Sequence, residues 1–394
     1  MVSQDFKSML SGKSVIRQLS EYATARGAEI GYENVYDYSL GNPSVPVPKA
    51  FTDAMIRLLT EEDPMKLHGY SQSQGIPAVR QAHAGYLNKR FGMNYTAEHL
   101  FMTTGAAGAI AHAVRAVTKP GDEVITFAPF FPEYMQYVNR TGAELVIVPA
   151  DTKTFQIDMD ALRDAFTEKT AAVLINTPNN PSGAMYTGET LTALAALMSE
   201  MQEKYAHEIF LISDEPYREI VFDGKIAPYP AHFYDNTLTC YSYSKSLSIP
   251  GERIGYVAVN PKAVDADIIS VMCGQISRGL GHNCPPSIIQ LAVSEVLGET
   301  ADLSVYETNM NILYDELVSL GFEVTRPGGT FYIMPRALGG DSLEFCNKAK
   351  EYDLILVPAD SFGAPGFFRM AYCIDTDKVE RSLDALRRFV RDKY

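Results

Sequence analysis

The chain has 394 residues, of which 46% are hydrophobic and 21% are charged, a composition typical of soluble globular proteins. Its length exceeds what one hydrophobic core usually supports, so we expect two domains. The formal net charge of −14 argues against nucleic acid or an anionic membrane as a binding partner.

Several other features are not expected, namely disulfides, a metal site, a secretory signal and a membrane span. The five cysteines are scattered without C-x-x-C spacing, so we predict free thiols in a reducing compartment rather than disulfides or a zinc site. The first ten residues lack the basic and apolar regions of a secretory signal, and no apolar run approaches the ~20 residues that span a bilayer. The seven histidines show no metal-ligand spacing, so no catalytic metal is expected. A cytoplasmic protein of enzyme size is predicted.

Strand-like apolar runs alternate with helical segments through the middle of the chain. Helices are predicted at 107–118, 158–166 and 187–204. The predicted strands are 123–127, 143–148, 171–175, 209–213, 238–242 and 254–259. This alternation indicates an α/β fold with a mostly parallel sheet and helices on both faces.

From residue 287 onward the pattern is that of a smaller α+β domain. The predicted elements are helices at 287–297, 301–320 and 377–391 and short strands at 322–325, 331–334 and 368–373. The Pro-rich segment 41–48 is predicted to mark the crossing of an N-terminal arm into the large domain. We therefore expect an arm with part of the small domain at 1–47, a large domain at 48–285 and a small domain at 286–394.

Most candidate functional residues follow predicted strands, where ligands bind in open α/β sheets. Gly105-Ala106-Ala107 opens a helix with small residues, which leaves backbone N–H groups accessible to an anion. Phe130 and Phe131 come after the strand that ends at residue 127, and one of them can stack on a planar ring. Each motif by itself also fits ordinary packing of a helix or an aromatic side chain.

Two further loops carry polar side chains. Two prolines and a glycine fix the loop 176–183, which directs the amide of Asn180 as a hydrogen-bonding group. Asp214 stands at the end of a strand, where a carboxylate can keep a pyridine nitrogen protonated. Asp214 could equally be a helix N-cap, and the nearby Tyr217 a packed aromatic.

The run Tyr241-Ser242-Tyr243-Ser244-Lys245-Ser246, followed by Arg253, is the most informative motif. A lysine among hydroxyl residues after a strand can form a Schiff base with a carbonyl cofactor, and Ser242 and Arg253 can hold a phosphate. Alone, the motif also fits a solvated lysine in a serine-rich loop. Arg369 lies in an apolar strand, where a guanidinium is costly to bury unless it pairs with an anion; a surface salt bridge is the alternative.

Taken in order, these motifs resemble those of the class I and II aminotransferases, pyridoxal-5′-phosphate (PLP) enzymes with the aspartate aminotransferase fold (fold type I). The resemblance runs from about Gly41 to Arg369. It implies a large domain with a mostly parallel seven-stranded sheet flanked by helices, plus a smaller α+β domain. It also implies ping-pong transfer of an amino group from an L-amino acid to a 2-oxo acid.

The resemblance implies roles for the matched residues around the cofactor. Lys245 would hold PLP as a Schiff base and carry the substrate Cα proton, and Asp214 would pair with the pyridine nitrogen. Tyr217 and Asn180 would bind the ring hydroxyl, and Phe131 would stack on the ring. The phosphate cradle would consist of Gly105, Ala106, Ala107, Ser242 and Arg253.

The resemblance also implies how substrate and subunits are arranged. Arg369, Gly41 and Asn180 would bind the substrate α-carboxylate. Tyr70, in His68-Gly69-Tyr70-Ser71, would reach the phosphate of the neighbouring subunit's cofactor. That match implies a homodimer with shared active sites.

Several alternatives stay open at this level. A PLP-dependent C–S β-lyase of the same fold would use the same residues. A PLP-sensing regulatory domain is also conceivable, but the roughly 40 residues before Gly41 are too few and insufficiently basic to form its DNA-binding module. An ω-carboxylate substrate would need a second cation, for which Arg278 is a candidate, whereas Phe130, Phe331 and Tyr332 would suit an apolar or aromatic substrate.

Overall fold

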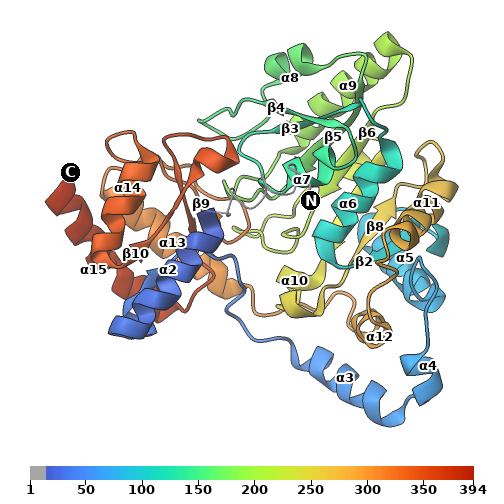
Figure 1. The fold of residues 1–394 in the computed structure, drawn as a ribbon, viewed down its shortest axis with the longest axis horizontal. Coiled ribbons are helices and arrows are strands. Elements are labelled where there is room, and N and C mark those ends of the chain that lie inside the picture. Colours follow the sequence, from blue (N-terminus) through green and yellow to red (C-terminus); the bar gives the residue numbers. More distant parts are fainter. Residues whose placement is uncertain (1–14) are drawn as a thin grey trace, which may run out of the picture.

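A seven-stranded sheet at the centre of the molecule confirms the predicted α/β fold. The computed structural model describes residues 15–394. The prediction that the chain starts without a secretory signal concerns the first ten residues, which lie outside this range. The sheet order is β2-β8-β7-β6-β5-β3-β4 (Figure 1). The strands are β2 (Leu100–Thr103), β3 (Glu123–Phe127), β4 (Glu144–Val148), β5 (Thr170–Asn176), β6 (Phe210–Asp214), β7 (Thr237–Ser242) and β8 (Gly255–Val259). Strand β8 is antiparallel to both of its neighbours.

Helices cover both faces of this sheet, because its strands are apolar on both sides. In β5, Ala172 and Leu174 pack in one cluster with α6 (Gly105–Val117) and α11 (Ala266–Gly279). Val173 and Ile175 point the other way. There they pack with α8 (Met159–Ala165) and α9 (Gly188–Tyr205). This alternation with a period of two residues is what a strand buried on both faces requires.

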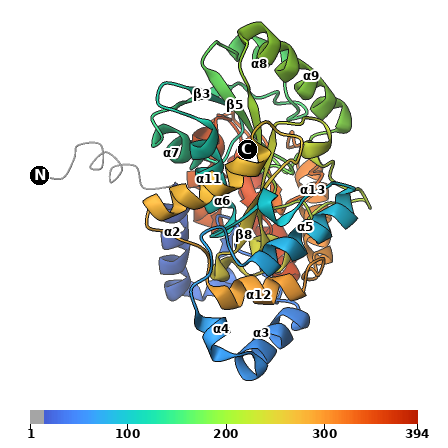
Figure 2. The same ribbon diagram turned by 90° about the vertical axis from the view of Figure 1, so that its right-hand side faces the viewer.

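The predicted strands and helices of this region match the structure to within one or two residues. Strand β2 was not predicted, since its four residues are too short a run to stand out from the apolar helices around it. Helix α11 and the helices α3 (Lys49–Glu61), α4 (Pro64–His68) and α5 (Pro77–Phe91) were likewise not predicted. Figure 2 shows α12 (Ser287–Glu295) lying beside α3 and α4.

The C-terminal region is built on a smaller sheet and joins the N-terminal segment. Its antiparallel strands are β9 (Tyr332–Ile333), β11 (Val357–Pro358) and β12 (Phe368–Ala371). A separate parallel pair joins β1 (Tyr36–Asp37) to β10 (Leu354–Ile355). Helices α2 (Val15–Ile30), α13 (Ser304–Ser319), α14 (Ser342–Ala349) and α15 (Thr376–Lys393) surround these strands. The boundaries at residues 47 and 285 stay a prediction.

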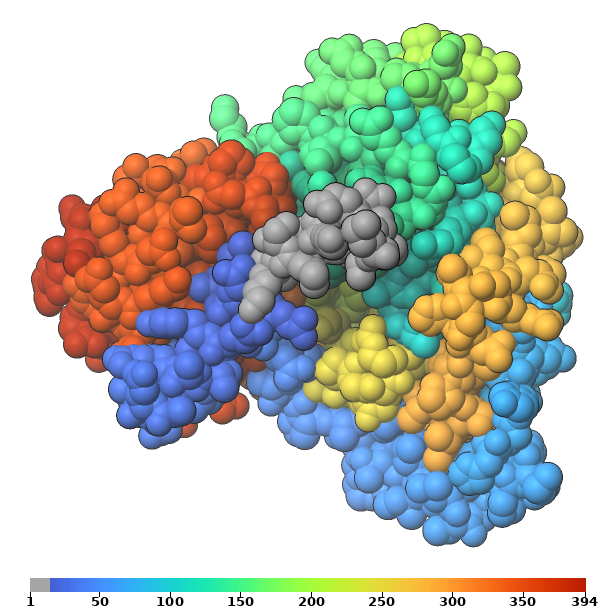
Figure 3. Space-filling model, in the orientation of Figure 1, coloured from blue at the N-terminus to red at the C-terminus, as the bar shows by residue number. Residues whose placement is uncertain are grey.

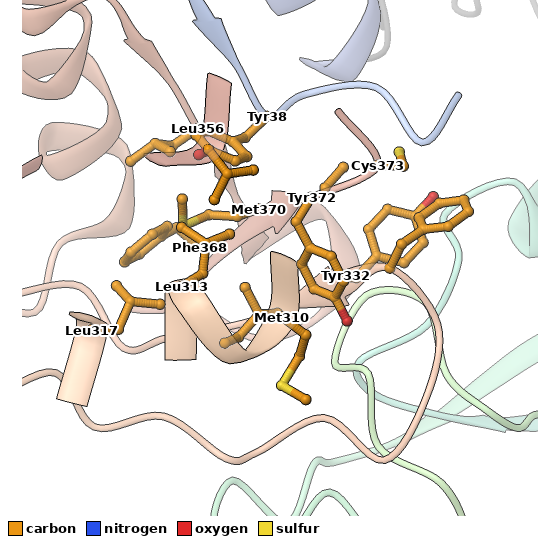
Figure 4. Close-up of a cluster of buried hydrophobic side chains, with 14 of the residues drawn as sticks. Tyr38, Met310, Leu313, Leu317, Tyr332, Leu356, Phe368, Met370, Tyr372 and Cys373 are labelled. Atoms are coloured by element: carbon orange, nitrogen blue, oxygen red, sulfur yellow. The ribbon is translucent and has the colours of Figure 1, made fainter. Parts of the chain in front are cut away.

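The core of this C-terminal region combines residues from both ends of the chain. Figure 4 shows Tyr38 beside Leu356. Met310 and Leu313 from α13 lie next to Phe368 and Met370 from β12 in the same cluster. The N-terminal segment is thus held by burial of its apolar side chains as well as by the β1–β10 pairing.

The strand predicted at 322–325 is wrong. Phe322 packs its ring 5.8 Å from Phe345 and 5.9 Å from Phe368, so its apolar character serves the core. Glu323 accepts one backbone hydrogen bond from Arg336 at 2.9 Å, but no ladder forms. The Pro327-Gly328-Gly329 sequence that follows favours a turn over continued strand pairing.

Phe345→Ala should destabilise the protein by about 3–5 kcal/mol, because it removes a ring from a packed core. Phe345 is fully buried and stacks on Phe368 at 4.7 Å. Urea unfolding followed by circular dichroism measures the loss. Leu343→Ala on the same helix is the control, since Leu343 is 58% exposed and its truncation should cost within about 0.5 kcal/mol. Equal losses in the two variants would contradict this account of the core.

Candidate active site

A cavity of about 670 Å³ opens at the carboxyl edge of the central sheet. The ends of β5, β6 and β7 meet there because parallel strands place their carboxyl ends on one edge. Residues from α2, from the segment after β1 and from the C-terminal region complete the walls. The cavity is lined by eleven residues predicted from the sequence: Gly41, Ala106, Ala107, Phe131, Asn180, Asp214, Tyr217, Ser242, Lys245, Arg253 and Arg369.

Asp214 is a buried carboxyl with one oxygen unused. The Oδ2 atom accepts a hydrogen bond from the Tyr134 hydroxyl at 2.5 Å, and Asn176 approaches it at 3.4 Å. The Oδ1 atom is buried and has no hydrogen-bond partner within residues 15–394. Burial raises the pKa of Asp214 to about 7. A cationic N–H group in the cavity would satisfy Oδ1 and favour the ionised carboxylate.

Lys245 presents its amine to the same cavity. Lys245 lies in α10 (Tyr243–Ser246), directly after β7, and its Nζ atom donates to the Gly41 carbonyl at 2.7 Å. Desolvation lowers the pKa of Lys245 to about 8, and the positive charges of Arg253 and Arg369 act in the same direction. The amine is therefore uncharged in roughly a tenth of molecules at pH 7, far more than for a solvated lysine, and the neutral form is what a nucleophile or base requires.

An anion cradle lies next to the lysine. Helix α6 begins at Gly105, whose φ of +79° is left-handed and favours glycine. A Cβ atom at Gly105 would lie 2.9 Å from the Arg253 Nη2 atom. Ser242 lies near the same place, with its hydroxyl 2.8 Å from that of Ser244. Free N–H groups of a helix start, two hydroxyls and a guanidinium together suit a phosphate.

A second anion site is centred on Arg369, which is 2% exposed. Its Nη1 atom donates to Asn180 at 3.2 Å and its Nη2 atom donates to the Ser39 carbonyl. The Nε atom is buried without a partner within residues 15–394. The guanidinium also lies 4.6 Å from the ring centre of Tyr332. A carboxylate entering the cavity would give Arg369 the charged partner that it lacks.

The loop after β5 holds Asn180 in a fixed position. The backbone N–H of Asn180 donates to the Asn176 side chain at 2.7 Å. Asn179 accepts from the backbone and hydroxyl of Ser182 at 3.0 and 2.7 Å. These bonds satisfy the polar groups of a buried loop, so the Asn180 amide reaches the cavity already oriented.

Tyr332 and Gly41 close the wall beside Arg369. The Tyr332 hydroxyl lies 3.3 Å from the Tyr217 hydroxyl. A Cβ atom at Gly41 would come within 1.8 Å of the Tyr332 oxygen. Only glycine fits at that close approach, so the Gly41 backbone can face the cavity.

Five candidate residues named in the sequence analysis do not line the cavity. Phe130 and Phe331 are buried in hydrophobic cores instead, so they are not available to contact an apolar substrate there. Gly105 lies directly behind the cavity at the start of α6, as described above. Tyr70 follows α4 with its side chain fully exposed (102%). Arg278 is exposed in the last turn of α11 and does not line the cavity of its own chain, so its role as a second cation stays a prediction. Arg278 is a candidate because it precedes the crossing between the two domains, but that position in the sequence does not give its distance from the cavity.

The structure also adds residues that sequence reasoning missed. Tyr134 and Asn176 both contact Asp214, and both belong to loops that were singled out for a neighbouring residue. Glu133 and Arg17 are charged and line the cavity. Nothing in the sequence pattern of α2 distinguishes Arg17 from a solvated arginine. Within residues 15–394 no group of three or more metal-binding side chains occurs, and no helix of that part is long and apolar enough to cross a membrane.

Comparisons with known proteins agree with this geometry. A family model described as aminotransferase class I and II matches residues 33–386. A probable N-acetyl-LL-diaminopimelate aminotransferase from Bacillus subtilis is 31% identical over 92% of this chain and 91% of its own. An aspartate aminotransferase from Geobacillus stearothermophilus is 30% identical over 91% of each chain.

Solved structures show the same likeness in three dimensions. An amino transferase from Eubacterium rectale superposes with a TM-score of 0.96 at 45% identity, over 100% of this chain and 99% of its own. Aspartate aminotransferase from Thermus thermophilus with maleate gives a TM-score of 0.87 at 26% identity, over 99% of each chain.

Asp214→Asn should stabilise the ligand-free protein increasingly as the pH rises from 5 to 7. In the folded wild type the pKa of Asp214 is raised to about 7, so its carboxyl keeps a proton that the unfolded chain releases above about pH 4. Stability from this group is complete below pH 4 and is lost as the pH rises to about 7. The advantage of the asparagine variant should grow by about 2–3 kcal/mol between pH 5 and pH 7.

Urea unfolding at both pH values measures this difference. Asp164→Asn is the control, because Asp164 is exposed and its replacement should give no pH-dependent difference. A constant offset between Asp214→Asn and the wild type would show that Asp214 is already ionised at pH 5.

Proposed function

The chain belongs to the class I and II aminotransferases and acts as an aminotransferase, and we propose that it uses PLP, held by Lys245, to move an amino group from an L-amino acid to a 2-oxo acid. The observation that carries the assignment of Lys245 is its amine in the cavity wall, with a pKa lowered to about 8. An ordinary solvated lysine would be almost fully protonated at neutral pH.

The unused polar atoms of the cavity fit this cofactor. When bound, PLP supplies a carbonyl that condenses with amines and a protonated pyridine ring that withdraws electrons. The free Oδ1 of Asp214 is suited to accept the pyridinium N–H, and the resulting ion pair keeps that nitrogen protonated. The cradle of Gly105, Ser242 and Arg253 is suited to the phosphate. Ala106 and Ala107 add the small side chains that let it approach the start of α6.

The cavity also offers candidate contacts for the faces and the edge of the pyridine ring of PLP. Phe131 lines the cavity, and its ring is held edge-on by Tyr134 at 5.7 Å, which suits stacking on a planar ligand. Tyr217 and Asn180 can both donate to a ring hydroxyl. Donation of two hydrogen bonds stabilises the ionised form of that hydroxyl.

Lys245 is the residue that we assign to proton transfer. Its neutral amine first acts as the nucleophile that anchors the cofactor. When the substrate amine takes over that bond, the Nζ atom would become free to accept the substrate Cα proton and deliver it to the former carbonyl carbon of the cofactor, two bonds away. Water would then release the 2-oxo acid. The hydrogen bond to the Gly41 carbonyl at 2.7 Å limits how far the amine can swing. The same steps run in reverse with a 2-oxo acid, which gives ping-pong kinetics.

Arg369 is suited to orient the amino acid for this transfer. A substrate α-carboxylate would replace the missing partner of its Nε atom through a paired hydrogen bond. Asn180 and the Gly41 backbone border the same place. Binding the carboxylate at a fixed point directs the Cα proton toward Lys245, which is the positional contribution to catalysis.

We also assign a homodimer with shared active sites. Tyr70 is fully exposed, although its motif predicts a contact with a cofactor phosphate. Helices α4 and α11 expose apolar side chains, among them Met65, Ile268 and Met272. The blue segment that contains α4 and the orange segment that contains α11 lie on one side of the molecule in Figure 3. Such a surface favours burial against a second copy. A reducing, cytoplasmic location is proposed because all five cysteines are free thiols.

Lys245→Ala should lower the rate of amino-group transfer by at least 10²–10⁴-fold, the usual contribution of a general base. The purified holoenzyme is mixed with single amino acids without a 2-oxo acid, and the cofactor spectrum is followed together with the products. Wild type should release a 2-oxo acid and retain the amino group on its cofactor. Lys225→Ala is the control, because Lys225 is exposed.

Two outcomes would contradict these assignments. Turnover of Lys245→Ala at the wild-type rate would exclude the role of Lys245. Release of ammonia together with the 2-oxo acid, while the cofactor returns unchanged, would indicate the C–S β-lyase instead of an aminotransferase.

Tyr70→Phe should weaken PLP binding by about 10- to 100-fold, as expected for the loss of one hydrogen bond to a charged group. Hybrid dimers of Tyr70→Phe with Lys245→Ala should regain one wild-type site, because the intact Lys245 of one subunit meets the intact Tyr70 of the other. Cofactor titration and activity of separated hybrids measure this. Hybrids with no more activity than the parent variants would show that Tyr70 does not cross between subunits.

A further inference from the structure

Two charged side chains of the cavity have no part in the proposed transfer. Asp214, Lys245, Arg253 and Arg369 are assigned to the cofactor and to the α-carboxylate. Glu133 and Arg17 also line the cavity and remain unassigned. A charged group in a cavity wall is costly unless a ligand meets it, which makes both side chains candidates for ligand recognition.

Glu133 is the more enclosed of the two. It follows Phe131 by two residues, directly before α7 (Tyr134–Asn139), and is half-buried. Its Oε2 atom is buried and has no hydrogen-bond partner within the described part of the chain. Burial raises the pKa of Glu133, although a hydrogen bond from its own backbone and the nearby positive charge of Arg369 counteract this. An N–H donor on a ligand would supply the missing hydrogen bond and favour the ionised carboxylate.

Arg17 is the exposed member of the pair. It lies in α2, whose residues Figure 3 shows in dark blue on the surface beside the C-terminal region. Its side chain is exposed to solvent. The field of an exposed charge is screened by water and salt, whereas the field of a partly enclosed charge on a ligand beside it is screened less. Glu133 should therefore dominate the choice of ligand.

We propose that Glu133 selects amino acids whose side chain ends in an N–H donor, a carboxamide or an ammonium group, and disfavours those that end in a carboxylate. This inference rests on the proposed function, because it requires Arg369 to hold the α-carboxylate. A distal carboxylate would meet the like charge of Glu133 in a desolvated wall. A distal carboxamide donates to Glu133, and its carbonyl oxygen is free to face Arg17.

The relatives do not decide this point. One is named for aspartate and another for N-acetyl-LL-diaminopimelate, substrates that differ in what their side chains present. The presence of Glu133 in this cavity favours the donor-bearing class over aspartate for this chain.

The first test measures binding without reaction. Glutaramate and glutarate both lack an amino group and differ only in a distal carboxamide or carboxylate. Calorimetric titration of the holoenzyme should show glutaramate binding at least tenfold more tightly than glutarate. Glu133→Gln should reduce this preference to less than threefold, and Arg17→Gln should retain it. Glu203→Gln, an exposed carboxylate on α9, is the control for a simple change in net charge.

Two binding results would overturn the inference. Glutarate could bind more tightly than glutaramate and lose its advantage in Arg17→Gln, which would assign the cavity to ω-carboxylate substrates with Arg17 as their cation. Equal binding of both ligands, unchanged in Glu133→Gln, would show that Glu133 does not contact the distal group.

A kinetic test separates this inference from the proposed function. Alanine has no distal group, so its conversion reports transamination alone. The ratio of kcat/KM for glutamine to that for alanine should fall at least tenfold in Glu133→Gln. No conversion of alanine or of any other amino acid by the wild type would refute the proposed function. Conversion of alanine with an unchanged ratio would refute only the role of Glu133.

Discussion

Charged groups enclosed without a full set of partners are the feature on which this molecule depends. Within residues 15–394, one oxygen of Asp214 and one guanidinium nitrogen of Arg369 are buried without a hydrogen-bond partner, and Lys245 is desolvated enough to lower its pKa to about 8. Burial of such groups opposes folding, so the surrounding core must supply the stability that they remove. The same groups are complementary to a pyridinium nitrogen, a carboxylate and a carbonyl carbon. The free energy that these unpaired groups cost the ligand-free protein is therefore recovered when a ligand supplies their partners.

The fold collects these groups by two different means. The parallel sheet brings the ends of β5, β6 and β7 to one edge, and with them Asn180, Asp214 and Lys245. The C-terminal region supplies Arg369 from β12, and the segment after β1 supplies Gly41. Those two are held in place by the β1–β10 pairing and by a core that includes Tyr38. The cavity therefore takes its walls from both packed regions, with Glu133 from the loop after β3 and Arg17 from α2 among them.

Much of the fold and of the chemistry could be predicted from the sequence. The strands buried on both faces are continuous apolar runs bounded by turns, and such runs are recognisable because burial on both sides tolerates few polar residues. The residues at their carboxyl ends form motifs whose order and spacing are characteristic of a family. The errors have physical causes as well. The segment 322–325 is apolar because Phe322 fills a core, and the four residues of β2 form a strand only because β8 pairs with them.

The sequence by itself determined which residues surround Lys245 in the cavity, because each of them lies in a local motif that follows a strand. Only the tertiary structure decided which distant residues complete the cavity. Arg17 and Tyr332 reach it from distant parts of the chain, Arg278 lies outside the cavity of its own chain, and Tyr134 donates to Asp214 across 80 residues of sequence. The role proposed for Glu133 also depends on the tertiary structure. From the sequence alone, a glutamate next to an aromatic loop is expected to be solvated, whereas within residues 15–394 its Oε2 atom is buried without a hydrogen-bond partner. Distances between segments far apart in sequence depend on packing, and no local pattern encodes them.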